Sequence, residues 1–166
     1  MLSKASVTTF LRKYGVLLAL VIVFIIFSLM EPTFYSVKNI LAIIRQASIT
    51  GILAIGLTTV VISGEFDMSF AANASFSGVL SIILMGKLLV GAVPAWFVGI
   101  TAALIIGVVN GLIIVYLGVP SIIETIGMMT LLAGFTKWLT DGSTYYSASF
   151  PDLLPALGRS SLFGVI

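Results

Sequence analysis

Long apolar runs separated by short polar breaks make up most of this chain. A spanning helix needs roughly 20 mostly apolar residues, and several runs free of charge approach or exceed that length. They cover Tyr14 to Met30, Gln46 to Gly64, Met68 to Gly86 and Leu88 to Ile123. The pattern predicts helices that cross a lipid bilayer at least four times.

The last run is too long for one ordinary crossing, and prolines mark its limits. Pro94 and Pro120 each disfavour helix in the residue before them, so one crossing is expected between them. Trp96 and Tyr116 then lie near its ends as interfacial anchors. A fifth crossing starts at Ser121 and runs to about Leu139. We therefore predict an all-α polytopic transmembrane helical bundle of about five spanning helices, forming a single domain over residues 1–166.

The segment 36–48 has two interpretations. One face of a helix there would carry the residues Val37, Ile40, Leu41, Ile44 and Ser48. That pattern suits a short helix lying at the membrane surface. A simple extension of the next spanning helix fits equally well.

Basic residues at the start of the chain indicate its orientation. Lys4, Arg12 and Lys13 precede the first run, and such residues usually stay inside, which predicts a cytoplasmic N-terminus. No small-residue cleavage site follows this run, so we interpret it as a retained helix. The later basic residues would all be external with five crossings, and they do not support the orientation; they are Lys38, Arg45, Lys87 and Arg159.

Composition agrees with a membrane protein and narrows its chemistry. Charged residues are 8% and hydrophobic residues 60% of the chain, against about a quarter and just under half in soluble domains. Cysteine and histidine are absent, which removes thiolate nucleophiles, imidazole bases and Cys/His metal sites. We expect no catalytic residue, metal or cofactor. The net charge of +2 is too small to indicate nucleic acid.

The stretch VVISGEFDMSF places two carboxylates between apolar runs. Asp67 immediately precedes an apolar helix, where it is expected to cap the first turn. Glu65 has no such evident role. It is either an exposed turn residue or a contact to a solute, pathway or partner subunit, because membrane carboxylates are usually paired or functional.

The sequence Ser121-Ile-Ile-Glu124 fits a capping box at a helix start. In that interpretation Ser121 is a structural cap and Glu124 completes it. A solute or partner contact remains the alternative for Glu124.

The third crossing carries a polar stripe. Ser69, Asn73 and Ser77 recur at four-residue spacing and share one helix face. Such a stripe points either to a solute pathway or to hydrogen bonds between helices, and both remain open.

The fourth crossing carries small residues with the same spacing. Ala103, Gly107 and Gly111 form a groove for helix packing. Asn110 lies beside it and must find a hydrogen-bond partner in lipid, which we expect on a neighbouring helix.

Two blocks of residues resemble a known family, the inner-membrane permeases of bacterial ABC importers, in the branch that includes ribose and other simple-sugar permeases. The first block matches the pattern I-S/T-G-G-x-D-L-S through Ile62-Ser-Gly64, Asp67 and Ser69. The second matches G-x-x-N-G followed by V-P-x-x-I-x-T-x-G through Gly107, Asn110, Gly111, Pro120, Thr125, Gly127 and Gly134. The similarity extends from Pro32 to Gly142.

The resemblance implies a permease subunit in the cell inner membrane that passes a sugar-like solute and catalyses no reaction. It implies three partners: a second permease subunit, a cytoplasmic ATP-binding subunit and a periplasmic or extracellular solute-binding protein. The candidates for lining the pathway are Ser69, Asn73, Ser77, Asn110 and Thr125.

The chain departs from the family pattern in charge and length. Glu65 stands where a second glycine is usual, and Glu124 where a small apolar residue is usual. Family members are about twice as long, so we expect the N-terminal half of such a permease, without the loop that docks on the ATPase.

Two other functions would use these carboxylates. Half of an ion-coupled secondary transporter would use Glu65, Asp67 or Glu124 as its coupling acid. An intramembrane aspartyl hydrolase would need Asp67 and Glu124 to share a proton, but no second Asp stands in a matching motif, which disfavours it.

Overall fold

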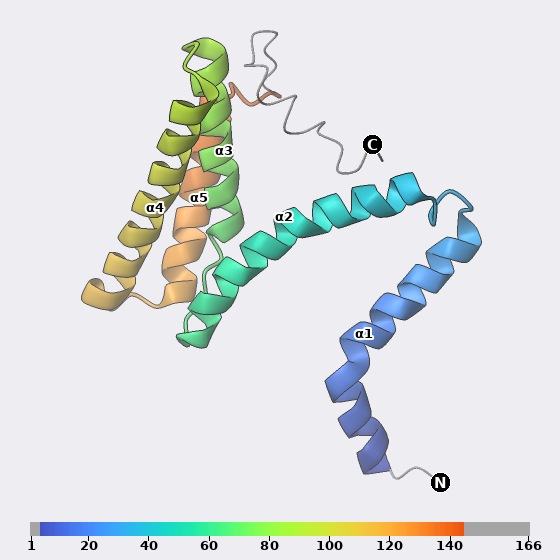
Figure 1. Ribbon diagram of the computed structural model, residues 1–166. Coiled ribbons are helices and arrows are strands. Elements are labelled where there is room, and N and C mark those ends of the chain that lie inside the picture. The colour runs from blue at the N-terminus through green and yellow to red at the C-terminus, as the bar shows by residue number, and fades with distance from the viewer. Residues whose placement is uncertain (1–3, 145–166) are drawn as a thin grey trace. The chain divides into compact units, whose positions relative to one another are not determined.

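The computed structural model describes residues 4–144, with side chains from residue 8, and this part of the chain is helical apart from short connections. Its helices are α1 (Lys4–Met30), α2 (Val37–Ile62), α3 (Phe70–Lys87), α4 (Ala92–Leu117) and α5 (Ser121–Leu139) (Figure 1). All five are long and apolar enough to cross a membrane. The predicted all-α fold with about five spanning helices is confirmed.

Glycine and proline set the boundaries around α4. Gly118 ends this helix with a φ of 68°, a left-handed conformation that glycine adopts at no steric cost. Pro120 then precedes α5 as its N-cap residue, with a φ of −55°. Pro94 lies in the first turn of α4, where its missing N–H leaves no intrahelical bond unmade. The helix therefore begins slightly before Pro94 rather than at it.

The second helix is continuous from Val37 to Ile62. Residues 36–50 contain neither proline nor glycine, so nothing interrupts the helical hydrogen bonds there. The separate surface helix over 36–48 is thus not formed, and the alternative interpretation, an extension of the next helix, is what the structure has.

The chain divides into two units that meet between Ile49 and Thr50, inside α2. In the first unit, the turn after α1 packs against the end of that helix. The ring centroid of Phe34 lies 5.3 Å from that of Phe24 and 5.6 Å from that of Phe27. Asn39 Nδ2 donates to the Phe34 carbonyl oxygen at 2.7 Å. Ring packing and this hydrogen bond fix the turn between α1 and α2.

In the second unit α3, α4 and α5 lie side by side (Figure 1). Helix α3 packs extensively along both others, which contact each other less. The starts of α3 and α5 and the end of α4 lie at one end of this unit, and the α3–α4 connection lies at the other. An antiparallel arrangement with short connections explains this placement.

A small apolar core lies where α3 ends and α4 begins. Its buried members are Met85, Ala92 and Ala95, with Leu84, Val90 and Trp96 packed against them. Next to this core, α3 and α4 approach closely at Gly99. A Cβ there would lie 2.8 Å from the Ser77 carbonyl oxygen and would overlap the hydroxyl of Ser81. Only glycine permits this separation of the two helices.

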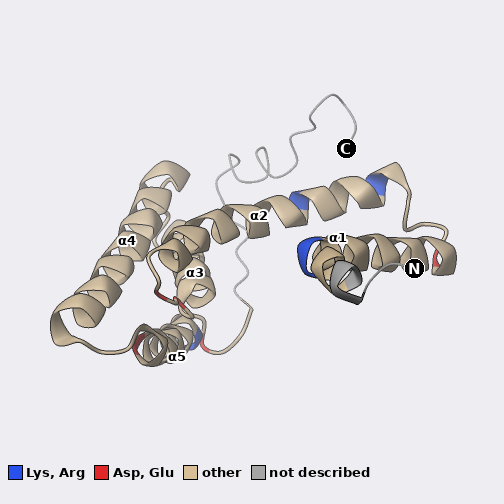
Figure 2. Cartoon of the chain, turned by 90° about the horizontal axis from the view of Figure 1, so that it is seen from below, with Lys and Arg blue, Asp and Glu red and all other residues tan. Residues whose placement is uncertain are grey.

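The second unit is polar inside and apolar outside in its described part. The buried polar side chains are Ser69, Ser77, Ser81, Asn110, Ser121, Glu124 and Thr125, and they outnumber the buried apolar ones. Large apolar side chains of α4 and α5 face outward, and Figure 2 shows how few charges lie along these helices. In water this distribution would be unfavourable, whereas lipid tolerates apolar surface and disfavours unpaired polar groups.

Candidate functional site

Acidic residues gather at one end of the second unit. Glu65 and Asp67 lie in the connection before α3, and Glu124 lies in the first turn of α5. Lys87 and Lys137 lie in the last turns of α3 and α5, at the opposite end. We call the end with the three carboxylates the acidic end.

Hydroxyl groups of α5 hold the α2–α3 connection in place. The Phe66 N–H donates to Ser121 Oγ at 3.3 Å, and the Met68 N–H donates to Thr125 Oγ1 at 3.1 Å. Both backbone groups belong to a non-helical segment and would otherwise lack a partner. Ser121 and Thr125 therefore fix where this connection lies against α5.

The expected capping box of α5 is not formed. Pro120 occupies the N-cap position, so Ser121 lies inside the first turn and its hydroxyl accepts from Phe66 instead. The Glu124 N–H donates to the Pro120 carbonyl oxygen at 3.1 Å. This arrangement leaves the Glu124 carboxyl available for other contacts.

Asp67 does not cap the first turn of α3 directly, as expected, but bonds to the residue that holds the N-cap position. Its Oδ1 accepts the backbone N–H of Ser69 at 2.7 Å and the hydroxyl of Ser69 at 2.6 Å. Ser69 is the N-cap residue of α3, and its side chain makes no capping hydrogen bond to the first turn. The carboxylate thus fixes the N-cap residue rather than the first-turn N–H groups.

Asn110 connects α4 to the acidic end. Its Nδ2 donates to Ser69 Oγ at 2.9 Å, as expected for a partner on a neighbouring element. With the amide turned end over end, the nitrogen donates instead to Glu124 Oε1 at 3.2 Å and to the Ile106 carbonyl oxygen at 3.1 Å. Asn110 therefore stands between Ser69 and Glu124, and all three side chains are buried.

A cavity of about 310 Å³ opens beside these residues. Its polar lining comprises Ser63, Glu65, Asp67, Asn110 and Thr125, and its apolar lining is Val60, Phe66, Gly107, Gly111, Ile114 and Val115. A few polar groups on a largely apolar wall are typical of small-molecule sites, whose volumes begin at about 300 Å³. A Cβ at Gly107 or Gly111 would meet no atom within 4 Å. Gly107 and Gly111 of the small-residue groove therefore face this opening, whereas Ala103 lines a separate recess.

The polar stripe of α3 lies against α4. Asn73 Nδ2 donates to the Ala103 carbonyl oxygen at 3.2 Å, and Ser77 Oγ donates to Asn73 Oδ1 at 3.3 Å. Asn73 and Ala103 also line a recess of about 260 Å³, which Asp67 shares. Of the residues expected along a pathway, Asn110 and Thr125 line the 310 Å³ cavity, Asn73 lines this recess, and Ser69 and Ser77 are buried between helices.

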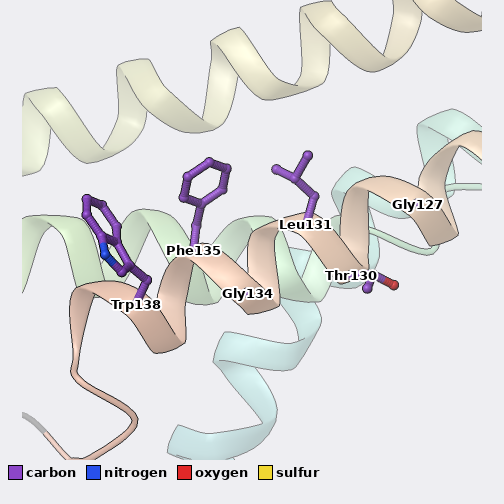
Figure 3. Close-up of a pocket in the computed structure, with 6 residues that line it drawn as sticks. All are labelled: Gly127, Thr130, Leu131, Gly134, Phe135 and Trp138. Atoms are coloured by element: carbon purple, nitrogen blue, oxygen red, sulfur yellow. The ribbon is translucent and has the colours of Figure 1, made fainter.

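A larger recess of about 740 Å³ lies on α5 alone (Figure 3). Gly127 and Gly134 leave the gap, and Leu131, Phe135 and Trp138 project from one side of the helix. Thr130 is its one hydroxyl-bearing residue. This apolar face lacks the converging polar groups that recognise a hydrophilic ligand, so the cavity at the acidic end is the candidate site.

Among residues 4–144, no group of three or more His, Cys, Asp or Glu side chains is arranged to hold a metal ion.

The role of one residue at this site differs from the role that the sequence predicts. The sequence predicts a capping role for the Ser121 hydroxyl, whereas in the structure this hydroxyl accepts the Phe66 N–H of the connection before α3. A serine directly after Pro120 was the available signal, because proline occupies the N-cap position and moves Ser121 into the helix.

Comparison with known proteins identifies the family. A family model described as "Branched-chain amino acid transport system / permease component" matches residues 39–162. The ribose import permease protein RbsC of Haemophilus influenzae is 32% identical over 170 residues, covering 98% of this chain and 51% of that protein. RbsC of Bacillus subtilis is 34% identical over 157 residues, covering 93% of this chain and 48% of that protein.

Relatives that are named for other sugars match as well. The galactose/methyl galactoside import permease protein MglC of Escherichia coli is 28% identical over 151 residues, covering 84% of this chain and 45% of that protein. The chain spans about half the length of these curated relatives. No solved structure matches it. The family match shows that this chain, a multi-pass membrane protein, belongs to the family that this model describes. The ribose import permeases among its relatives confirm the resemblance that its motifs indicated.

Proposed function

We propose that this chain is a permease subunit of an ABC importer and forms part of the translocation pathway for a sugar-like solute. The observation that carries the proposal is the similarity to two ribose import permeases over 93% or more of the chain. The galactose-type relative extends this similarity to a second monosaccharide permease.

The cavity at the acidic end supports a hydroxyl-rich solute. Asn110 supplies an amide that both donates and accepts, the exposed Ser63 supplies a hydroxyl, and Asp67 supplies a carboxylate acceptor. A sugar presents donors and acceptors around its ring, so groups of this kind can bind several of its hydroxyls. We propose that Ser69, Asn73 and Ser77 support the pathway by holding α3 against α4.

Transport further requires the three partners that the motifs imply. They are a second permease subunit, a cytoplasmic ATP-binding subunit and an external solute-binding protein. We propose that Glu65, which is exposed and lines the cavity, contacts the solute or a partner. In this proposal the ATP-binding subunit supplies the energy for transport.

Uptake by cells that produce the protein with its partners tests the proposal. Labelled ribose, galactose and xylose are offered in turn, first to cells depleted of ATP and then to cells whose proton and sodium gradients have been dissipated. We expect uptake of at least one sugar to stop on ATP depletion and to survive loss of the gradients. Uptake that depends on a gradient and ignores ATP would instead identify an ion-coupled carrier.

Thr125→Val with Thr130→Val as its matched control examines the cavity itself. Both residues lie on α5, but only Thr125 lines the cavity at the acidic end. Thr125→Val removes the acceptor of the Met68 N–H and so loosens the connection that forms one wall of the cavity. We expect it to raise the half-saturating sugar concentration and Thr130→Val to leave it unchanged. Equal effects from both would disconnect this cavity from the solute.

A further inference from the structure

Four polar side chains form a line across the acidic end, from the α2–α3 connection through α4 to α5. Asp67 Oδ1 lies 2.6 Å from Ser69 Oγ, and Ser69 Oγ lies 2.9 Å from the nearer atom of the Asn110 amide. The farther amide atom lies 3.2 Å from Glu124 Oε1. Each of these three contacts is short enough to require a hydrogen between its two atoms.

Two ionised carboxylates cannot supply these hydrogens. If Asn110 Nδ2 faces Ser69, then Oδ1 faces Glu124 Oε1 and the Ile106 carbonyl oxygen, which are acceptors only. If the amide is turned, Oδ1 faces Ser69 Oγ, whose single proton already serves Asp67. In either orientation one contact joins two acceptors.

One added proton completes the line. We propose that Glu124 is a proton-binding site and is a neutral acid in the folded protein. Its O–H donates to Asn110 Oδ1, Asn110 Nδ2 donates to Ser69 Oγ, and the Ser69 hydroxyl donates to the Asp67 carboxylate. All three contacts then have a donor and an acceptor, while Asn110 Oδ1 stays in van der Waals contact with the Ile106 carbonyl oxygen at 3.1 Å. With the amide turned, a proton on Asp67 would complete the same three contacts, so burial decides which carboxyl holds the proton.

Burial places the proton on Glu124 rather than on Asp67. The Glu124 side chain is only 8% exposed, and its Oε2 has no hydrogen-bond partner. In a carboxylate that oxygen would carry half of the charge without compensation, whereas in a neutral acid it is a carbonyl oxygen, which costs less to bury. Asp67 is half-buried, accepts two hydrogen bonds and lines the cavity, so it holds the negative charge.

The surrounding helices offer no cation that would replace the proton. Residues 50–62 of α2 contain no titratable side chain. Lys87 of α3 and Lys137 of α5 lie at the far end, and Tyr116, the titratable residue of α4, is 79% exposed. Glu65 lines the same cavity and adds further negative charge. The four oxygen-bearing groups lie in a line rather than around one point, which fits a chain of hydrogen bonds and not a metal ion.

The inference is independent of the proposed transport role, because it depends only on hydrogen bonding within the second unit. Infrared spectroscopy of the purified full chain in lipid nanodiscs tests it. A protonated carboxyl gives a C=O stretching band apart from the carboxylate bands. We expect this band in neutral buffer, and we expect it to shift when glutamate, but not aspartate, carries carbon-13 in its side-chain carboxyl. This labelling experiment needs no variant and so does not depend on a variant folding.

Three variants place the proton, with helical circular dichroism and gel filtration to confirm folding. Glu124→Gln should abolish the band, because its amide N–H replaces the acid O–H toward Asn110. Asp67→Asn should retain the band. Glu65→Gln is the matched control, since it changes an exposed glutamate of the same cavity that lies outside the line, and it should also retain the band.

Absence of the band in the unmodified chain would overturn the proposal, as would its survival in Glu124→Gln. A shift on aspartate labelling, or loss of the band in Asp67→Asn, would place the proton on Asp67 and would equally reject a neutral Glu124.

Discussion

The two ends of the α3–α5 unit are held together by different means. Where α3 passes into α4, the contact is made by a small apolar core around Met85 and Ala95 and by Gly99, which lets the helix backbones approach. At the acidic end, Ser69 and Asn110 connect α3 to α4, and Ser121 and Thr125 connect the α2–α3 connection to α5. Close packing stabilises the first end and hydrogen bonds stabilise the second.

The difference shows how helices select neighbours in lipid. Lipid tails are as apolar as leucine, so apolar contact alone gives little preference for one partner over another. Small residues gain dispersion contacts by close approach, while buried polar groups are satisfied only in one arrangement. The packed end therefore sets the distance between helices, and the acidic end sets their register.

The largest expected effect is at the packed end. Gly99→Leu forces α3 and α4 apart, because even a Cβ at this position would lie 2.8 Å from the Ser77 carbonyl oxygen. We expect a loss of about 3 kcal/mol in the free energy of unfolding, at the upper end of the usual cost of overpacking. Denaturation in mixed detergent micelles, followed by circular dichroism, measures it. Gly78→Leu is the matched control, since nothing lies within 4 Å of a Cβ there, and similar losses in both would contradict the close approach at Gly99.

A somewhat smaller loss is expected from Asn110→Leu at the acidic end. The change leaves the buried side chains of Ser69 and Glu124 without their shared partner. Leaving buried polar groups unsatisfied costs about 2 kcal/mol, measured by the same denaturation. Asn73→Leu removes two hydrogen bonds from a half-buried residue and should cost about 1 kcal/mol. A greater loss for Asn73→Leu would reverse the importance assigned to the acidic end.

Asp67→Ala should have a moderate effect. It removes the acceptor of two hydrogen bonds from Ser69, at 2.7 and 2.6 Å, and so loosens the start of α3. We expect a loss of about 1 kcal/mol in the free energy of unfolding and a lower yield of folded protein. Asp67→Asn keeps an acceptor oxygen and should recover most of that yield in gel filtration. No difference between the two variants would mean that the hydrogen bonds to Ser69 contribute nothing.

The smallest effect is expected from Glu65→Gly. Glu65 is exposed and directly follows Gly64, which already supplies the left-handed residue of this turn with a φ of 86°. The free energy of unfolding should change by no more than about 0.5 kcal/mol, as for most surface substitutions. A loss as large as that of Asp67→Ala would show a structural role for Glu65.

The spanning helices could be predicted from sequence because their signals are local. Charge-free runs and Pro120 each act within a few residues, and they placed the start of α5 at Ser121. The sequence does not decide whether α2 is continuous, since the amphipathic pattern at 37–48 fits both a separate surface helix and an extension of the next spanning helix. The lack of a helix breaker in that segment was the more reliable signal.

The contacts at the acidic end could be predicted only in part. A hydrogen-bond partner for Asn110 on a neighbouring element was expected, but its identity depends on how α4 is rotated against a residue 41 positions earlier. Ser121 Oγ accepts the N–H of Phe66, which lies 55 positions earlier in the chain. This contact replaces the local capping motif because Pro120 holds the N-cap position. Gly99 carried no distinguishing signal, since the need for glycine there arises from the Ser77 carbonyl oxygen and the Ser81 side chain opposite it.

The side-by-side packing of α3 and α4 has a consequence for the surrounding bilayer. Helix α3 has 18 residues and α4 has 26, so at 1.5 Å per residue α4 is longer by about 12 Å. A hydrocarbon layer matched to α3 would leave the far end of α4, with its exposed Tyr116, among the lipid headgroups, where tyrosine is favoured. The thickness of the membrane therefore influences the tilt of α4, and this helix should be tilted at different angles in thinner and thicker bilayers.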